Sequence, residues 1–432
     1  MDMFARPDLL LDVYRPLLRS AFFGADLLRK LPGAERVFKS LRGAAARPPA
    51  AVVAPGPVDV RTRDSAPINL DSTLAEIVGP RGLPGLAALA LRGDRIIARG
   101  VAGLRKRGSP ERITPDDRFH LGSCGKAMTA TLAAILIEEG KLNWTTTLPE
   151  LFGDVVAEIH PAWSGVTLQQ VLAHRSGLRR DAGVRLRTLL LSSGLTLPQQ
   201  RLAAVAASLS RPPKYRPGTK LVYSNEGYML AGAALEKLTG LDWPELMQER
   251  LFCPLGITTA GFGVPGTAGT VDQPWGHVPF LGSPIDPGKP AAEAPLFHIP
   301  AGLQHMTMTD WAKFIALHLR GDAANPNRRL TLLKPETFAQ LHPSGAAGEY
   351  AAGWILESKE WAKGAQPGAT GRVLMHSGSN FRWFCYVWMA PEIDFAVLTA
   401  CNRGMDLAAW KVCHRAARAL IRAFASESPL AP

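Results

Sequence analysis

The chain has 432 residues with a formal net charge of +12, and 47% of them are hydrophobic and 20% charged. This balance is typical of a soluble globular protein with a large core, and the length fits either several domains or one domain with an insertion. Excess positive charge often marks nucleic-acid or membrane binding, but here the basic residues are scattered and form no nucleic-acid-binding signature. Nucleic acid is therefore excluded as an expected partner.

Cysteine and histidine spacing bears on metals and redox chemistry. The 5 cysteines form no C-x-x-C pair and their number is odd, which indicates neither a zinc ribbon nor a disulfide framework. None of the 10 histidines lies in an H-E-x-x-H arrangement. We therefore expect no metal and no other cofactor.

Residues 1–42 are predicted to form an amphipathic helical extension, because apolar residues such as Leu10, Tyr14 and Leu17 recur at roughly helical spacing. Charged residues interrupt every apolar stretch, which argues against a signal peptide and favours a cytoplasmic location, with periplasmic and membrane-peripheral locations left open. We leave three roles open for this helix: docking on the body of the protein, self-association and peripheral membrane binding. The Ala/Pro-rich residues 43–66 predict a linker.

The body, residues 67–432, opens with a short helix and a β-hairpin and ends with a block of strands and a final helix. The expected helices are 70–78, 127–139 and 406–425, and the expected strands are 85–91, 95–103, 352–356, 373–376, 385–390 and 395–400. Strands at both ends with helices between them predict an α+β fold with one antiparallel sheet. We expect an α/β lobe of about 67–122 and 336–425, a helical lobe of about 123–335, and a site in a cleft between them.

The first candidate catalytic motif is an S-x-x-K sequence, Ser123 to Lys126, at the start of the apolar 127–139 segment. Residues three apart lie on one face of a helix, so the lysine amine can reach the serine hydroxyl. A partly buried ammonium has a lowered pKa and can act as the base for a serine nucleophile. Cys124 is a weaker rival, because it points about 100° away around the helix.

The second motif is Tyr223-Ser224-Asn225. The Tyr223 hydroxyl, placed beside the lysine, could relay the serine proton to the leaving group, and Asn225 offers an amide to a substrate carbonyl.

The third motif is His376-Ser377-Gly378-Ser379 at a strand edge. Gly378 allows the backbone to pass close to a ligand, and the N–H of Ser379 together with that of Ser123 could form an oxyanion hole.

These motifs, in this order, resemble the serine β-lactamase/penicillin-binding-protein superfamily, specifically class C β-lactamases and family VIII carboxylesterases. The resemblance implies a β-lactamase-like fold over about residues 70–425, with Ser123 as acylated nucleophile, Lys126 and Tyr223 as the base system, and Asn225 and the His376 strand as substrate contacts. The segment from His174 to Leu178 matches a loop of the family, in which we interpret His174 as a structural turn residue.

Two departures from class C β-lactamases bear on the substrate. His376 stands where those enzymes have the lysine of Lys-Thr-Gly, and a histidine is mostly neutral at pH 7 but would gain charge towards about pH 6. Phe381, Arg382 and Trp383 replace a run of small residues, so Arg382 and Trp383 are expected to contact the substrate at an aromatic cleft wall.

Both departures favour a carboxylesterase that acts on small esters. A β-lactamase, a D-amino-acid peptidase or amide hydrolase, and a catalytically idle scaffold remain as alternatives. The absence of a G-x-S-x-G sequence argues against an α/β-hydrolase.

Overall fold

The computed structural model describes residues 61–62, 66–79, 82–329 and 332–426. The predicted helical extension, residues 1–42, and most of the linker, residues 43–66, lie outside the described residues. Within the described part the chain divides into two compact units: a helical unit of Asn143–Asp242, and a larger unit formed by the segments before and after it.

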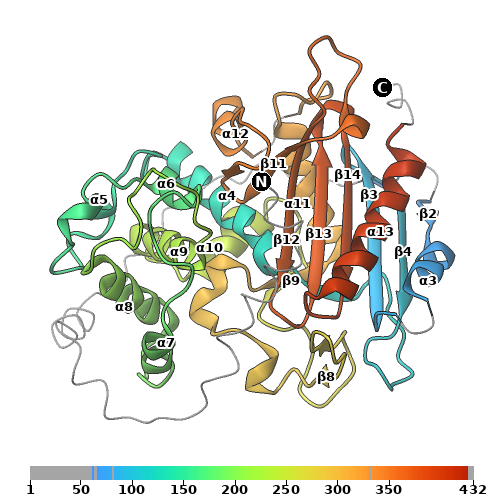
Figure 1. Cartoon of the computed structure of the whole chain (residues 1–432), viewed down its shortest axis with the longest axis horizontal. Helices are drawn as coiled ribbons and strands as arrows, with labels where there is room; N and C mark the ends of the chain where they lie inside the picture. Colours follow the sequence, from blue (N-terminus) through green and yellow to red (C-terminus); the bar gives the residue numbers. More distant parts are fainter. Residues whose placement is uncertain (1–60, 63–65, 80–81, 330–331, 427–432) are drawn as a thin grey trace. The chain divides into compact units, whose positions relative to one another are not determined.

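The larger unit is built on a nine-stranded sheet whose path runs β1-β4-β3-β14-β13-β12-β11-β10, with β2 also paired to β4. The hairpin β3–β4 lies beside the C-terminal strand β14, so strands from the two ends of the described chain are neighbours (Figure 1). The strands are β1 Arg61–Thr62, β2 Ile68–Asn69, β3 Gly85–Arg92, β4 Arg95–Gly103, β10 Tyr350–Ala351, β11 Trp354–Ser358, β12 Arg372–Ser379, β13 Phe384–Ala390 and β14 Phe395–Cys401.

This sheet confirms the α+β prediction with one correction. All pairings from β4 to β10 are antiparallel, but the short strands β1 and β2 pair with β4 in parallel, so the sheet is mixed. Every residue of β3, β13 and β14 is buried, which explains why these strands are almost entirely apolar instead of alternating.

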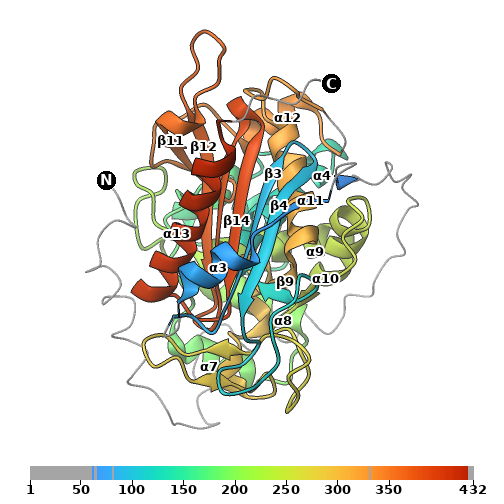
Figure 2. The same ribbon diagram turned by 90° about the vertical axis from the view of Figure 1, so that its right-hand side faces the viewer.

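Helices cover both faces of the sheet. Figure 2 shows α3 (Asp71–Val78) and α13 (Leu407–Phe424) on one face and α11 (Met308–Gly321) on the other. The helix α4 (Gly125–Glu138) is buried along nearly its whole length, as its all-round apolar sequence predicts, and α12 (Pro335–Leu341) packs against it. The remaining elements of this unit are β5 Arg118–His120, η2 Gly122–Cys124, α10 Trp243–Met247, η4 Gln248–Phe252, β6 Gly261–Phe262, β7 Gly276–His277, β8 Pro284–Ile285, η5 Pro290–Ala292, η6 Leu296–Ala301, β9 Gln304–Thr307, η7 Glu360–Ala362 and η8 Pro391–Ile393.

The helical unit is organised around α8 (Leu197–Leu209) and α9 (Asn225–Thr239), which pack together and are joined by a buried ion pair between Arg201 and Glu236. Its shorter helices are α5 Leu148–Phe152, η3 Pro161–Trp163, α6 Leu168–Leu172 and α7 Val184–Leu191. Thr147 and Thr167 begin α5 and α6 with capping boxes, which fix where these short helices start.

The helical unit is narrower than the predicted lobe of residues 123–335. The helices α4 and α11 belong instead to the larger unit, where α11 contacts β3 and β14. Sequence composition alone does not separate these helices from those of the helical unit, because both groups are amphipathic or apolar. In the described residues we find no helix that is both long and apolar enough to cross a membrane.

Candidate active site

The larger unit brings Ser123 and Lys126 together at the point where the short helix η2 leads into α4. The Lys126 Nζ donates to Ser123 Oγ at 3.1 Å and to the carbonyl oxygen of Ala301 at 2.5 Å. The lysine side chain is completely buried, whereas Ser123 is only partly buried. An amine held this close to a hydroxyl that solvent reaches is the geometry of a base beside its nucleophile.

The backbone around Ser123 lies against the end of β12. An added Cβ on Gly122, whose φ is +48°, would lie 2.2 Å from the backbone nitrogen of Ser379, and one on Gly378 would lie 1.9 Å from the carbonyl oxygen of Leu121. Only glycine fits on both sides of this contact. The segments that carry the Ser123 and Ser379 amides are therefore held side by side, although their joint role as an oxyanion hole stays a prediction.

Glu293 links these two segments, and the sequence analysis did not identify it. One carboxylate oxygen lies 2.9 Å from His120 Nε2, and His120 Nδ1 accepts the N–H of Gly122 at 3.0 Å. The other oxygen accepts from the side-chain amide of Asn380 at 3.1 Å. Because His120 Nδ1 is an acceptor, the neutral ring carries its proton on Nε2, which faces Glu293.

Glu293 thus bridges the turn before Ser123 and the residue after Ser379. No sequence signal could have found this bridge, because Glu293 lies in an irregular loop far from either motif.

His376 lies on β12 with its side chain buried at 2% exposure. Its Nε2 lies 3.1 Å from the hydroxyl of Tyr350, and its Nδ1 lies 2.6 Å from the carbonyl oxygen of Ser377. Burial, together with the positive charge of Lys126, lowers the pKa of His376 to about 3. The expectation that this histidine gains charge near pH 6 is therefore wrong, and its contact with substrate stays a prediction.

Arg382 and Trp383 follow β12 in a tight turn. Trp383 is fully buried, and its indole stacks on the His120 ring with the centroids 5.8 Å apart, so it supports the turn before Ser123. This corrects the expectation of an accessible aromatic wall at Trp383. Arg382 is half-buried and donates to the backbone carbonyls of Ala291 and Phe381, which leaves a substrate role for it untested.

Tyr223 and Asn225 belong to the helical unit, at the start of α9. The Tyr223 ring packs on the ring of His174 with the centroids 4.4 Å apart, and His174 Nδ1 accepts the N–H of Ser224 at 3.2 Å. His174 is buried and has a φ of +56°, which is consistent with the structural turn residue that we expected. Asn225 Nδ2 donates to Asp181 Oδ1 at 2.7 Å. The participation of Tyr223 and Asn225 in chemistry at Ser123 stays a prediction.

The rival nucleophile Cys124 points into the core of the larger unit. Its Sγ lies 3.5 Å from that of Cys385 and 3.7 Å from the carbonyl oxygen of His376, and the residue is 3% exposed. A buried thiol among apolar neighbours is inert, so the geometry favours Ser123. Over the described ranges, no three His, Cys, Asp or Glu side chains cluster as metal ligands.

Known proteins resemble the chain over about three quarters of its length. The chain is 27% identical to penicillin-binding protein 4 of Amycolatopsis lactamdurans over 75% of this chain and 82% of that protein. It is also 27% identical to a D-aminopeptidase of Brucella anthropi, over 74% of this chain but only 56% of that protein. The chain thus spans little more than half of the length of that second relative.

Solved structures show the same fold. The class C β-lactamase of Rhodobacter sphaeroides matches 82% of this chain and 98% of its own with a TM-score of 0.61 and 20% identity. The β-lactamase/D-alanine carboxypeptidase of Pseudomonas syringae matches the same share of each chain with a TM-score of 0.63 and 16% identity. The model of the Beta-lactamase family matches residues 70–420, and this chain therefore belongs to that family of serine hydrolases.

Proposed function

We propose that the chain hydrolyses small carboxylic esters through an acyl-enzyme on Ser123. The observation that carries this proposal is the buried Lys126 amine 3.1 Å from the hydroxyl of the half-buried Ser123. In its deprotonated form this amine accepts the hydroxyl proton as Ser123 Oγ attacks the ester carbonyl carbon. Tyr223 is proposed to pass that proton on to the leaving alkoxide.

The reaction then proceeds in two balanced halves. In the first, the Oγ–acyl bond forms, the ester C–O bond breaks and the alcohol leaves with the proton. In the second, water attacks the acyl carbon, gives a proton back to Ser123 and releases the carboxylic acid. The amides of Ser123 and Ser379 are proposed to stabilise the negative oxygen that develops in each half.

The preference for esters over β-lactams rests on His376. A cephalosporin needs a cation near its carboxylate, and with a pKa of about 3 the histidine is uncharged at every working pH of an ordinary enzyme. The loss of one charge-assisted hydrogen bond is worth about 1–3 kcal/mol, or about 5- to 150-fold in rate.

A hydrolase of D-amino-acid amides or peptides is the second candidate, because a D-aminopeptidase is among the relatives. Both activities would use the same nucleophile, so only a comparison of substrates distinguishes them.

A substrate panel followed by intact mass tests the proposal. The panel contains p-nitrophenyl esters of rising chain length, a chromogenic cephalosporin and D-alanyl p-nitroanilide, with a fluorophosphonate probe to label Ser123. We expect intact mass to show the probe and the acyl group attached to Ser123. We also expect the butyrate ester to be hydrolysed much faster than the cephalosporin and the D-alanyl p-nitroanilide. Faster turnover of the D-alanyl amide would favour the second candidate, and absence of any label on Ser123 would favour an idle scaffold.

A further inference from the structure

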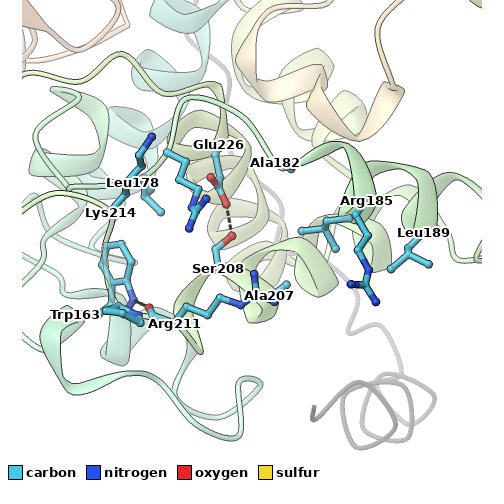
Figure 3. Close-up of a pocket in the computed structure, with 14 residues that line it drawn as sticks. Trp163, Leu178, Ala182, Arg185, Leu189, Ala207, Ser208, Arg211, Lys214 and Glu226 are labelled. Atoms are coloured by element: carbon cyan, nitrogen blue, oxygen red, sulfur yellow. Dashed lines mark hydrogen bonds between the residues drawn. The ribbon is translucent and has the colours of Figure 1, made fainter. Parts of the chain in front are cut away.

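The helical unit contains a cavity of about 150 Å³ that is separate from the residues of the proposed chemistry. Its wall is formed by the 178–189 segment, which includes α7, and by the end of α8 with the loop that follows it (Figure 3). Trp163 and Leu178, both buried, supply part of its apolar surface. An engineered cavity of similar volume holds a benzene molecule, so this space suits a ligand of about six to eight non-hydrogen atoms.

Glu226 is the one acidic side chain among the described residues that line this cavity. The residue is 4% exposed, and its Oε1 accepts a hydrogen bond from the Ser208 hydroxyl (Figure 3). Its Oε2 is buried and has no hydrogen-bond partner among the described residues. Burial raises the pKa of the Glu226 carboxyl above its ordinary value. A buried carboxyl oxygen without a partner is costly to the fold and calls for a donor from a ligand.

Basic side chains surround the outer part of the cavity. Arg179, Arg185, Arg211 and Lys214 line it and are all exposed, so their charged groups reach solvent. No carboxylate of the described residues forms an ion pair with Arg185 or Arg211. The site therefore combines one buried acid with an exposed set of cations, which is complementary to a molecule with a positive group at one end and a negative group at the other.

We propose that this cavity binds a small free α-amino acid, with its ammonium group on Glu226 and its carboxylate on Arg179, whose segment is hydrogen-bonded to the start of α9. A simple carboxylate would satisfy the arginines but would leave the Glu226 oxygen without a donor. A simple amine would satisfy Glu226 but would bring a second positive charge beside the arginines. A zwitterion supplies both charged groups, and a small one fits the available volume.

The site also touches the loop that holds Asn225. The carbonyl oxygen of Arg179 accepts from the Ser224 hydroxyl, and that of Arg180 accepts the N–H of Asn225 at 2.7 Å. A ligand against Arg179 therefore contacts the segment that fixes the start of α9. The proposal does not depend on which substrate Ser123 acts on.

Calorimetric titration of the full chain tests the proposal, with Ser123 first blocked by the fluorophosphonate so that the reaction site cannot contribute. We expect L- or D-alanine to bind at least about 10-fold more tightly than propionate or ethylamine, since each of these lacks one of the two charge-assisted contacts. Equal binding of alanine and propionate would overturn the zwitterion assignment. No alanine binding at millimolar concentrations, or binding that only unblocked protein shows, would overturn the site.

Two variants locate the ligand within the cavity. Glu226→Gln should weaken alanine binding at least about 10-fold while leaving propionate binding unchanged. Arg179→Gln should weaken both, because Arg179 lies beside the start of α9 that carries Glu226. Because Arg179 is exposed, the fold should tolerate this change even if Glu226→Gln does not fold. The matched control is Arg187→Gln on α7, since Arg187 does not line the cavity. Unchanged alanine affinity in Arg179→Gln, or an equal loss in Arg187→Gln, would contradict the proposal.

Discussion

The two units hold their candidate site residues in different ways. In the larger unit, Ser123 lies in the short helix η2 and Lys126 in the buried helix α4 that follows it. The backbone beside Ser123 is held against β12 by glycine-only contacts and bridged by Glu293. In the helical unit, Tyr223 and Asn225 are half-buried and depend on a loop, through His174 and Asp181. The difference indicates that the nucleophile is held by packing that tolerates almost no change, whereas its proposed partners are held by a ring contact and a hydrogen bond, to which side chains can adjust.

The largest effect should come from the base on the buried helix. We expect Lys126→Ala to reduce ester turnover at least about 10³-fold, because the remaining groups cannot take up the Ser123 proton. Tyr223→Phe should cost less, about 10²-fold, if Tyr223 only relays the proton. Steady-state kinetics with a butyrate ester checks both, with Ser123→Ala as the inactive reference. A greater loss in Tyr223→Phe than in Lys126→Ala would reverse the assigned roles.

A glycine in each unit tests how tightly its backbone is packed. Gly378→Ala would place a Cβ 1.9 Å from the carbonyl oxygen of Leu121, so the segment must shift and the Ser379 amide with it. We expect a loss of about 10²-fold in kcat, as when an oxyanion-hole donor is removed.

The control for this substitution is Gly227→Ala in α9, where the nearest atom would lie 3.4 Å away. This variant should keep nearly full activity and should be at least as stable as the wild type, because alanine favours a helix. Near-wild-type kcat in Gly378→Ala would show that the contact with β12 does not position the site.

Glu293 should act as a positioning residue. We expect Glu293→Gln to lower kcat about 10-fold with little change in KM, because the two amide-bearing segments lose the carboxylate that accepts from both of them while the substrate contacts stay. Glu293→Asp should recover part of the loss. Glu336→Gln on α12 is the matched control and should leave both constants unchanged. A rise in KM with constant kcat would instead assign Glu293 to substrate binding.

The last prediction concerns the acid stability of the larger unit rather than its activity. Burial lowers the pKa of His277 and His305 to about 4 and that of His376 to about 3, whereas each has its ordinary pKa of about 6.5 when unfolded. Between these values the unfolded chain binds more protons, so stability falls as the pH drops below about 6.5. Each histidine contributes up to about 1.4 kcal/mol per pH unit.

Chemical denaturation at about pH 7.5 and about pH 5 measures this dependence. His277→Gln should flatten it, because glutamine keeps a hydrogen-bonding side chain without a titrating group. An unchanged slope would mean that His277 is not protonated on unfolding in this range. Over the same range the preference for esters over cephalosporins should stay constant, since His376 does not titrate there.

The local sequence pattern was enough to predict most of the main strands and helices of the larger unit. The hairpin was predicted at 85–91 and 95–103 and is observed at Gly85–Arg92 and Arg95–Gly103, because short β-rich runs around a Gly-containing loop are local signals. The buried helix after Ser123 followed from its all-round apolar sequence in the same way. The distance between Ser123 and Lys126 also follows from sequence, since helical geometry sets it.

Only the tertiary structure decided the surroundings of these residues. His376 belongs to the third candidate motif and Trp383 follows that motif closely in the sequence. The pairing of β12 with β13 and the packing of η2 nevertheless bury both side chains. Burial then moves the pKa of His376 far from its ordinary value, which no sequence pattern shows. Glu293 and the Glu226 cavity depend on contacts between segments that are distant in the chain, and such contacts are fixed by the packing of the whole unit.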